Sequence, residues 1–380
     1  MGFEANAKCE MELWRRYEDQ FPVRKHLTYL NHAAVAPLCR PAAEAMQALA
    51  QDACEFGSLH YDDWMTTYEG LRAAAARLIG ATAREIAIVK NTSEGISFVA
   101  TGLNWRPGDR LVAFREEFPA NYYPWKILEG SGVRVEWLSY LDPLDRIDEA
   151  CRGARLLAIS FVQYLSGYRA DLEAIGEICR RNDCIFFVDA IQGLGAFPVD
   201  VRTAGIHALA ADGHKWLLGT EGCGILYISQ EIQDVVRPVE IGWTNMAGYA
   251  DYADRELKLR GDAGRYESGT LNTIGCYGLK ASIDFLLDVG LGFISPVVQN
   301  LADMVAEGVQ AKGYEVLGSR TPATGAGIVS FRKEGIAAGA IVAKLREERV
   351  AAAPRQGWVR VSPHFYISPD EIRRMVELLP

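Results

Sequence analysis

Short runs of β-branched and aromatic residues alternate, from about residue 86 onward, with segments in which apolar residues recur every three or four positions. In Asp171–Arg181, for example, the recurring apolar positions predict an amphipathic helix. This alternation is typical of an α/β domain with a mostly parallel central sheet flanked by helices. The predicted strands are Ile86–Lys90, Arg110–Arg115, Val133–Ser139, Arg155–Phe161, Cys184–Asp189, Ala208–Ala211 and Ile225–Ile228. Because ligands bind beyond the carboxyl ends of such strands, residues that follow the strands are the first candidates for a site.

The pattern changes after about residue 260. Two long helical segments, Thr273–Val289 and Ser295–Lys312, precede strands near Ile328–Phe331 and Trp358–Val361. The last helix begins with Ser368-Pro369-Asp370-Glu371, in which Ser is the N-cap and Glu completes a capping box. We expect a large α/β domain over residues 20–260. Residues 261–380, joined by residues 1–19 with a helix around Met11–Asp19, form a smaller α+β domain.

Composition narrows the class of protein. The 380 residues carry a net charge of -9, which argues against a general nucleic-acid binder because phosphate backbones require a basic surface. Apolar runs such as Leu156–Val162 are too short to span a bilayer. The eight cysteines form no C-x-x-C pair and lie among apolar neighbours, and the six histidines lack metal-ligand spacing. We expect a cytoplasmic protein with reduced thiols, no bound metal and no membrane or nucleic-acid partner.

Lys215 follows the predicted strand at 208–211, in Asp212-Gly213-His214-Lys215. A buried amine tends to lose its proton and can then attack a carbonyl, although a lysine at a strand end is usually a surface residue. Asp189 ends another strongly apolar strand, where a carboxylate needs a cationic partner or hydrogen-bond donors, or is a helix N-cap. The protonated ring nitrogen of pyridoxal 5'-phosphate (PLP) is such a partner.

Other candidates also follow strands. Thr92 and Ser93 open a helical segment after Ile86–Lys90, where backbone amides and hydroxyls bind a phosphate or simply cap the helix. Phe118, after Arg110–Arg115, is placed to stack on a flat ring or to join the core. Near the C-terminus, Arg355 and Arg360 flank a predicted strand, and their guanidinium groups suit a carboxylate or a surface ion pair.

In this order, the motifs resemble those of the aminotransferase class V family of fold-type I PLP enzymes. The family includes cysteine desulfurases, selenocysteine lyases, kynureninases and isopenicillin-N-epimerase-like proteins. The resemblance runs from Tyr29-Leu30-Asn31-His32-Ala33-Ala34 to His364-Phe365-Tyr366. It implies the fold-type I transferase fold, PLP as the cofactor and an amino acid as the substrate.

The resemblance also assigns roles to individual residues. Lys215 is the Schiff-base lysine and Asp189 pairs with the ring nitrogen, so these two are the catalytic residues. The implied cofactor-binding residues, besides these two, are Thr92, Ser93, Phe118, Gln163, Gln192, His214 and Thr270. The implied substrate-binding residues are Arg360, which grips the carboxylate, together with Asn31, His32 and Arg355. Thr270, in Arg265-Tyr266-Glu267-Ser268-Gly269-Thr270, resembles the segment that reaches the neighbouring subunit's phosphate, which implies a homodimer with shared active sites.

Two positions depart from the family pattern. Asp212 stands where desulfurases commonly have a phosphate-binding serine, so Asp212 turns away from the phosphate or the phosphate cup differs. No cysteine follows Cys276, whereas desulfurases use a thiolate from a loop upstream of the arginine region. We therefore expect an enzyme other than an ordinary cysteine desulfurase.

The motifs identify the cofactor and the first step but leave the last step open. The reading we favour is an aminotransferase class V type transaminase that works through Schiff-base chemistry at Lys215. A β-lyase or an epimerase on the same scaffold is the alternative among enzymes. A PLP-fold regulatory protein is the non-enzymatic alternative, and the pairs Gly193–Gly195 and Gly222–Gly224 lack the third glycine of a nicotinamide-binding fold.

Overall fold

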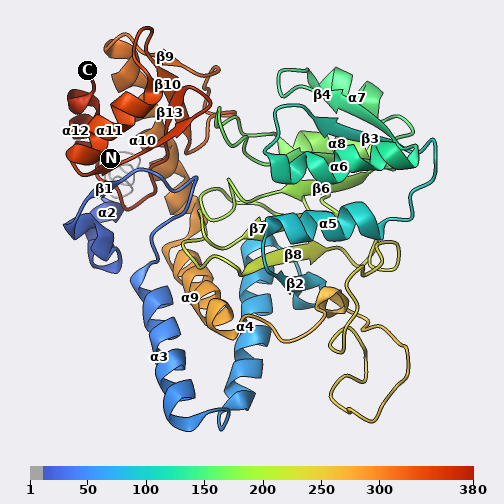
Figure 1. Cartoon of the computed structure of the whole chain (residues 1–380). Coiled ribbons are helices and arrows are strands. Elements are labelled where there is room, and N and C mark those ends of the chain that lie inside the picture. The colour runs from blue at the N-terminus through green and yellow to red at the C-terminus, as the bar shows by residue number, and fades with distance from the viewer. Residues whose placement is uncertain (1–11) are drawn as a thin grey trace, which may run out of the picture.

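A seven-stranded sheet forms the centre of the larger part of the chain, as Figure 1 shows. The structure is a computed structural model and describes residues 12–380. The strand order is β2-β8-β7-β6-β5-β3-β4, and β8 alone runs against its neighbours. The strands are β2 (Ile86–Val89), β3 (Arg110–Phe114), β4 (Arg134–Leu138), β5 (Leu156–Ser160), β6 (Ile185–Asp189), β7 (Ala208–Asp212) and β8 (Gly224–Ile228). The predicted mostly parallel sheet is confirmed.

Both faces of this sheet are buried. In β6, Phe186 and Val188 belong to one hydrophobic core, and the intervening Phe187 belongs to a second core on the opposite face. Side chains alternate across a strand, so a strand covered by helices on both faces must be apolar at every position. The flanking helices are α5 (Thr92–Gly102), α6 (Tyr123–Lys126), α7 (Leu144–Cys151) and α8 (Leu172–Arg181). This explains why the strands read as continuous apolar runs.

A smaller antiparallel sheet, of order β12-β13-β10-β9, lies in the C-terminal part. Its strands are β9 (Glu315–Val316), β10 (Val329–Arg332), β12 (Ala353–Arg355) and β13 (Trp358–Val361). The helices of this part are α10 (Leu291–Ala311), α11 (Ala338–Glu347) and α12 (Pro369–Leu378). Near the N-terminus, β1 (Thr28–Tyr29) pairs in parallel with β11 (Val350–Ala351), so residues beyond 19 also join this part. The exact boundary between the two domains stays a prediction.

Long helices link the two parts. In Figure 1, α3 (Arg40–Phe56), α4 (Tyr61–Ile79) and α9 (Thr273–Val289) lie side by side below the C-terminal part. The helix α10 begins at Leu291, four residues before the predicted start, because Ile294 packs into the core and extends the helix past Pro296. The predicted helix at 11–19 is shorter, with α2 over Leu13–Arg16 and a 3-10 turn over Glu18–Gln20. Met11 lies outside the described residues.

The predicted cap of the last helix is confirmed. The Ser368 hydroxyl accepts a hydrogen bond from the Glu371 amide, and the Glu371 carboxylate accepts one from the Ser368 amide at 2.8 Å. Within residues 12–380, no single helix is long and apolar enough to cross a membrane. The pair α9 and α10, bent by 86°, would meet that test by length and composition only.

Candidate active site

A cavity of about 570 Å³ lies beyond the carboxyl ends of the parallel strands. Strand ends of the large sheet form one wall, and Pro354, Arg355, Gln356 and Arg360 of the small sheet form the other. The fold therefore builds the site between two parts that lie more than a hundred residues apart in sequence. The predicted residues that line it are Thr92, Ser93, Phe118, Asp189, Gln192, His214, Lys215, Arg355 and Arg360.

Lys215 reaches the cavity from a tight turn after β7. At Gly213 a side chain would come within 2.8 Å of the Cys223 carbonyl oxygen and of Leu279, so glycine allows the turn to pack. Burial lowers the pKa of Lys215 to about 8, and the positive charge of Arg360 acts in the same direction while Asp189 opposes it. A substantial fraction of this amine is therefore neutral near pH 8, as a nucleophile or general base requires.

Asp189 ends β6 in the middle of the sheet and is buried. Its Oδ1 accepts a hydrogen bond from the Ile191 amide at 3.1 Å. Burial raises the pKa of Asp189 to about 6, and the charge of Lys215 only partly offsets this. A carboxylate kept in an apolar strand end gains most from a cationic group placed beside it.

The helix α5 brings its N-terminus to the cavity. Asn91 is the N-cap and accepts a hydrogen bond from the Glu94 amide at 2.9 Å. The helix packs closely on β7, since a side chain at Gly95 would lie 2.8 Å from the Ala210 methyl group. Thr92 anchors the turn by accepting the Asp212 amide at 3.0 Å, and Ser93 is exposed beside it. Free amides at this helix end suit an anion.

Asp212 does not turn away from the cavity. It is buried at the cavity wall, and its Oδ2 lies 3.1 Å from His214 Nδ1. Asp212 Oδ1 and His214 Nδ1 are both buried without a hydrogen-bond partner. This cavity wall therefore differs from one built on a serine, because a buried acid lies next to the His214 ring.

Arg360 lies on β13 and points into the cavity from the small sheet. Its Nη1 donates to the Tyr164 carbonyl oxygen at 2.8 Å, whereas its Nε is buried without a partner. Burial, with a contribution from Arg355, lowers the pKa of Arg360 to about 10. Two guanidinium groups at one wall, one of them incompletely paired, favour a bound carboxylate.

An aromatic ring covers the lysine. Phe118 is 47% exposed, and its ring centroid lies 5.8 Å from Lys215 Nζ. Its ring meets that of Tyr164 edge to face, with centroids 5.3 Å apart. The sequence analysis missed Tyr164, although it follows β5 and so obeys the same strand-end rule. Phe118 is thus placed over the cavity rather than in the core.

Behind this wall lies a buried acid, Glu117, that was not predicted as a site residue. Glu117 accepts hydrogen bonds from the Tyr140 hydroxyl at 2.7 Å and the Ser160 amide at 2.6 Å. Burial raises the pKa of Glu117 to about 8, and the nearby Asp189 charge adds to the effect. Glu117 is a positioning residue for the strand ends that carry Ser160 and Asp189.

Four predicted residues, Asn31, His32, Gln163 and Thr270, are not among those that line the cavity. The Gln163 side chain is engaged elsewhere, with Nε2 donating to the Glu116 carbonyl oxygen at 2.6 Å and Oε1 accepting from the Ser166 amide. Its placement near a cofactor stays a prediction. His32 is fully buried between the Ser362 carbonyl oxygen and the Tyr366 hydroxyl. The backbone of Asn31 forms an isolated parallel β-bridge with that of Ser362.

The three residues that follow His32 line the cavity at the place predicted for Asn31 and His32. Ala33, Ala34 and Val35 line the cavity instead of Asn31 and His32. Gln192 lines it but has both amide ends occupied, with Nε2 donating to the Ala33 carbonyl oxygen at 3.0 Å and Oε1 accepting from Trp216 Nε1 at 3.1 Å. Aromatic packing around His32 outweighed the polar character of Asn31 and His32, which the sequence alone does not reveal.

Thr270 lies elsewhere on the molecule. It is exposed and borders a separate small hollow with Arg72, Trp243 and Glu267. It is not among the residues that line the cavity around Lys215.

The aminotransferase class-V family profile matches residues 28–365. A Bacillus subtilis protein named an uncharacterized aminotransferase is 28% identical, over 95% of this chain and 96% of its own length. A probable cysteine desulfurase of Pyrococcus abyssi is 31% identical over 94% of each chain. The apo structure of a cysteine desulfurase from Thermococcus onnurineus superposes with a TM-score of 0.88 at 27% identity, over 96% of each chain.

The chain belongs to the aminotransferase class V family, and it is a PLP-dependent enzyme with the fold-type I architecture. The predicted family, fold and cofactor are confirmed. The relatives named cysteine desulfurases do not support the expectation that this chain is something other than a desulfurase. That expectation rests only on the missing C-terminal cysteine.

The residues around the cavity fit PLP. Asp189 places a buried carboxylate where a protonated pyridine nitrogen would satisfy it, and Lys215 supplies an amine of lowered pKa. The amides at the start of α5, with Ser93 and His214, would hold the phosphate, and Phe118 would cover the ring. The buried Arg360 Nε, which has no hydrogen-bond partner, provides a further donor for an anionic group.

Proposed function

We propose that this chain is a transaminase that transfers the amino group of an α-amino acid, with Lys215 and Asp189 as catalytic residues and Arg360 as the carboxylate-binding residue. The observation that carries the proposal is that these three side chains line one cavity, although they come from β6, the turn after β7, and β13. A regulatory protein would not need an amine, an acid and a guanidinium group placed together in this way.

Bound PLP supplies an aldehyde that condenses with amines and a cationic ring that accepts electron density from the α-carbon. Lys215 would hold the cofactor through Nζ, and its amine of lowered pKa is the group that would take the α-proton. Asp189 would pair with the ring nitrogen and keep it protonated. Arg360 binds the substrate carboxylate in a forked geometry and so orients the bond to the α-proton. Phe118 and Tyr164 restrict the opening above Lys215.

The residues that line the cavity bear on the last step of the reaction, which decides the product. None of the described residues that line the cavity is a cysteine, so this wall supplies no thiolate to accept sulfur from a substrate. Transamination would require only the Lys215 amine to carry the proton, without a further side chain, which favours this outcome. The desulfurase names of relatives favour a second candidate, removal of a sulfur atom from cysteine.

Product analysis separates these candidates. The purified holoenzyme is incubated with a panel of amino acids, with and without a 2-oxo acid acceptor. Transamination yields more than one equivalent of 2-oxo acid per active site only when the acceptor is present, together with the amino acid made from the acceptor. Sulfide or persulfide from cysteine would instead support a desulfurase, release of a small fragment would support a β-lyase, and an inverted amino acid would support an epimerase. Any of these as the sole product overturns the transaminase proposal.

The identity of the lysine has its own test. Borohydride treatment of the holoenzyme should fix the cofactor to the peptide that contains Lys215, and Lys215→Ala should lose both the visible absorbance and turnover. Lys90→Ala is a matched control, because Lys90 is an exposed lysine paired with Glu94 outside the cavity. Fixation to another lysine would contradict the assignment.

We also propose a cytoplasmic homodimer. Thr270 is exposed and remote from the cavity of its own chain, which supports a role toward a neighbouring subunit. The described cysteines are all free thiols, which supports a reducing compartment. Size-exclusion chromatography with light scattering tests the dimer, and Thr270→Ala should weaken cofactor affinity if the neighbour uses this hydroxyl.

A further inference from the structure

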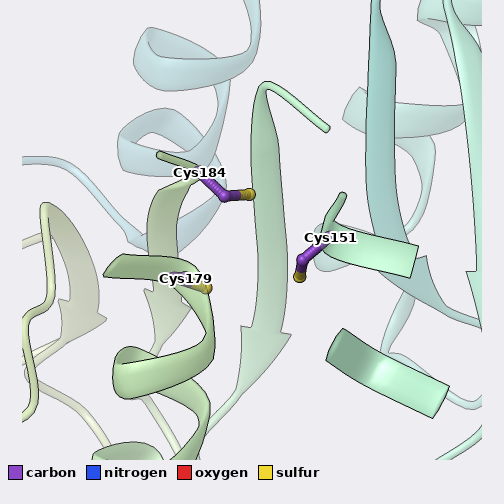
Figure 2. A group of neighbouring side chains, drawn as sticks. All are labelled: Cys151, Cys179 and Cys184. Atoms are coloured by element: carbon purple, nitrogen blue, oxygen red, sulfur yellow. The ribbon is translucent and has the colours of Figure 1, made fainter. Parts of the chain in front are cut away.

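Three buried thiols converge near the amino end of β6, at the end of the parallel strands opposite to the Lys215 cavity. Cys151 is the last residue of α7, Cys179 lies in the last turn of α8, and Cys184 precedes β6. Their sulfur atoms all lie within 4.8 Å of one another, and each residue is buried. Figure 2 shows the three side chains coming from separate segments, with their sulfur atoms toward a common space. The sequence did not reveal this group because the spacings 28 and 5 match no common zinc motif.

We propose that Cys151, Cys179 and Cys184 bind one thiophilic d10 metal ion, Zn²⁺ or Cu⁺, at a site separate from the active site. Thiolates select these ions over harder cations. With metal–sulfur bonds of about 2.3 Å, sulfur atoms around the ion lie about 3.8 to 4.0 Å apart. The thiols therefore need to close by less than about 1 Å, which small rotations of their side chains provide.

The surrounding backbone favours a cation at this place. Both α7 and α8 end at the cluster, and the C-terminal end of a helix carries a partial negative charge. That field opposes three free thiolates but stabilises a bound metal ion.

A second cavity gives the metal ion an entry path. It measures about 660 Å³ and is lined by Cys179 and Cys184, together with Arg155, Arg180 and Arg202. Three thiolates leave a net charge of −1 with Zn²⁺ or −2 with Cu⁺. The three arginines already pair with Asp109, Glu177 and Glu85, and Asp183 and Glu231 also line the cavity, so its lining carries both signs of charge. The same cavity admits a water molecule as a fourth ligand of Zn²⁺, whereas Cu⁺ is satisfied by three sulfur atoms.

Other thiols of the chain serve as controls. Cys223 and Cys276 are also buried, with sulfur atoms 3.9 Å apart, but they form only a pair. Cys54 is exposed and stands alone. Neither offers the three sulfur ligands of the cluster.

The test uses the PLP-loaded enzyme, reduced and stripped with a chelator under anaerobic conditions. It is titrated separately with Zn²⁺ and with Cu⁺ against a colour-forming chelator for each ion. We expect one ion per chain in at least one titration, and X-ray absorption should find three sulfur neighbours at about 2.3 Å. A first shell of nitrogen and oxygen, or no binding near one equivalent, would overturn the proposal even without a variant.

Variants locate the site. Cys179→Ala and Cys151→Ala should each weaken binding at least a hundredfold, whereas Cys276→Ala removes an equally buried thiol and should leave binding unchanged. Circular dichroism and the cofactor absorbance show whether each variant is folded. Unchanged affinity in the folded Cys179→Ala protein, or loss of the metal when PLP is removed, would refute this site. The outcome is independent of whether the enzyme is a transaminase.

Discussion

Replacing Asp189 by Asn should make the apoenzyme more stable and the holoenzyme much less active. The carboxyl is buried at the end of β6, and burial raises its pKa from 3.8 to about 6. Ionising it in the folded apoenzyme therefore costs about 3 kcal/mol, at about 1.36 kcal/mol for each pKa unit. The amide has nearly the same shape, and its oxygen can still accept the hydrogen bond from the Ile191 amide.

The sign of the pH dependence follows from the raised pKa. Between pH 3.8 and about 6 the folded state holds more protons than the unfolded state, so wild-type stability falls as pH rises through this range and then levels off. The Asn variant lacks this loss. We expect the variant to be more stable than wild type by about 1.6 kcal/mol at pH 5 and by about 3 kcal/mol at pH 8.

Urea denaturation of both apoenzymes, at one protein concentration and at both pH values, measures this difference. In the holoenzyme, the same change should lower kcat/KM by at least about a hundredfold, because electrostatic support of the developing charge is worth about 3 kcal/mol or more. A destabilised variant, or a stability gain that does not grow with pH, would refute the account of Asp189. Near-wild-type activity would refute its pairing with the ring nitrogen.

Three further changes test other parts of the structure. Because burial lowers the pKa of Lys215 to about 8, the rate at which the apoenzyme captures PLP should rise with pH, with a midpoint near pH 8. Visible absorbance of the bound cofactor measures this rate. A midpoint at the ordinary lysine value would contradict the burial argument. Arg360→Lys should raise KM for the amino acid by about 10- to 100-fold, since the forked contact is lost, and the exposed Arg355→Lys should have a smaller effect in the same kinetic assay. Ser368→Ala should lower the free energy of unfolding by about 1 kcal/mol through loss of the Glu371 capping box, without changing kcat; an unchanged urea midpoint would argue against the cap.

The sequence by itself determined the parts that depend on local pattern. Apolar runs located all seven strands of the large sheet, and the residues that end or follow them include Asp189, Lys215, Thr92 and Phe118. All four reach the cavity because the carboxyl ends of parallel strands share one edge of the sheet. The capping box at Ser368 was equally local, since both partners lie within one turn.

Only the tertiary structure decided the features that depend on distant segments. It turned His32 into the core because Ser362 and Tyr366, more than 300 residues away in sequence, satisfy both ring nitrogens. The fold also places the Gln163 side chain in a local turn and Arg360 in contact with the Tyr164 carbonyl oxygen. It brings together the thiols of three separate segments, Cys151, Cys179 and Cys184. A pattern along the chain records which side chains are polar, whereas the partner that each polar side chain finds is set by how the elements pack.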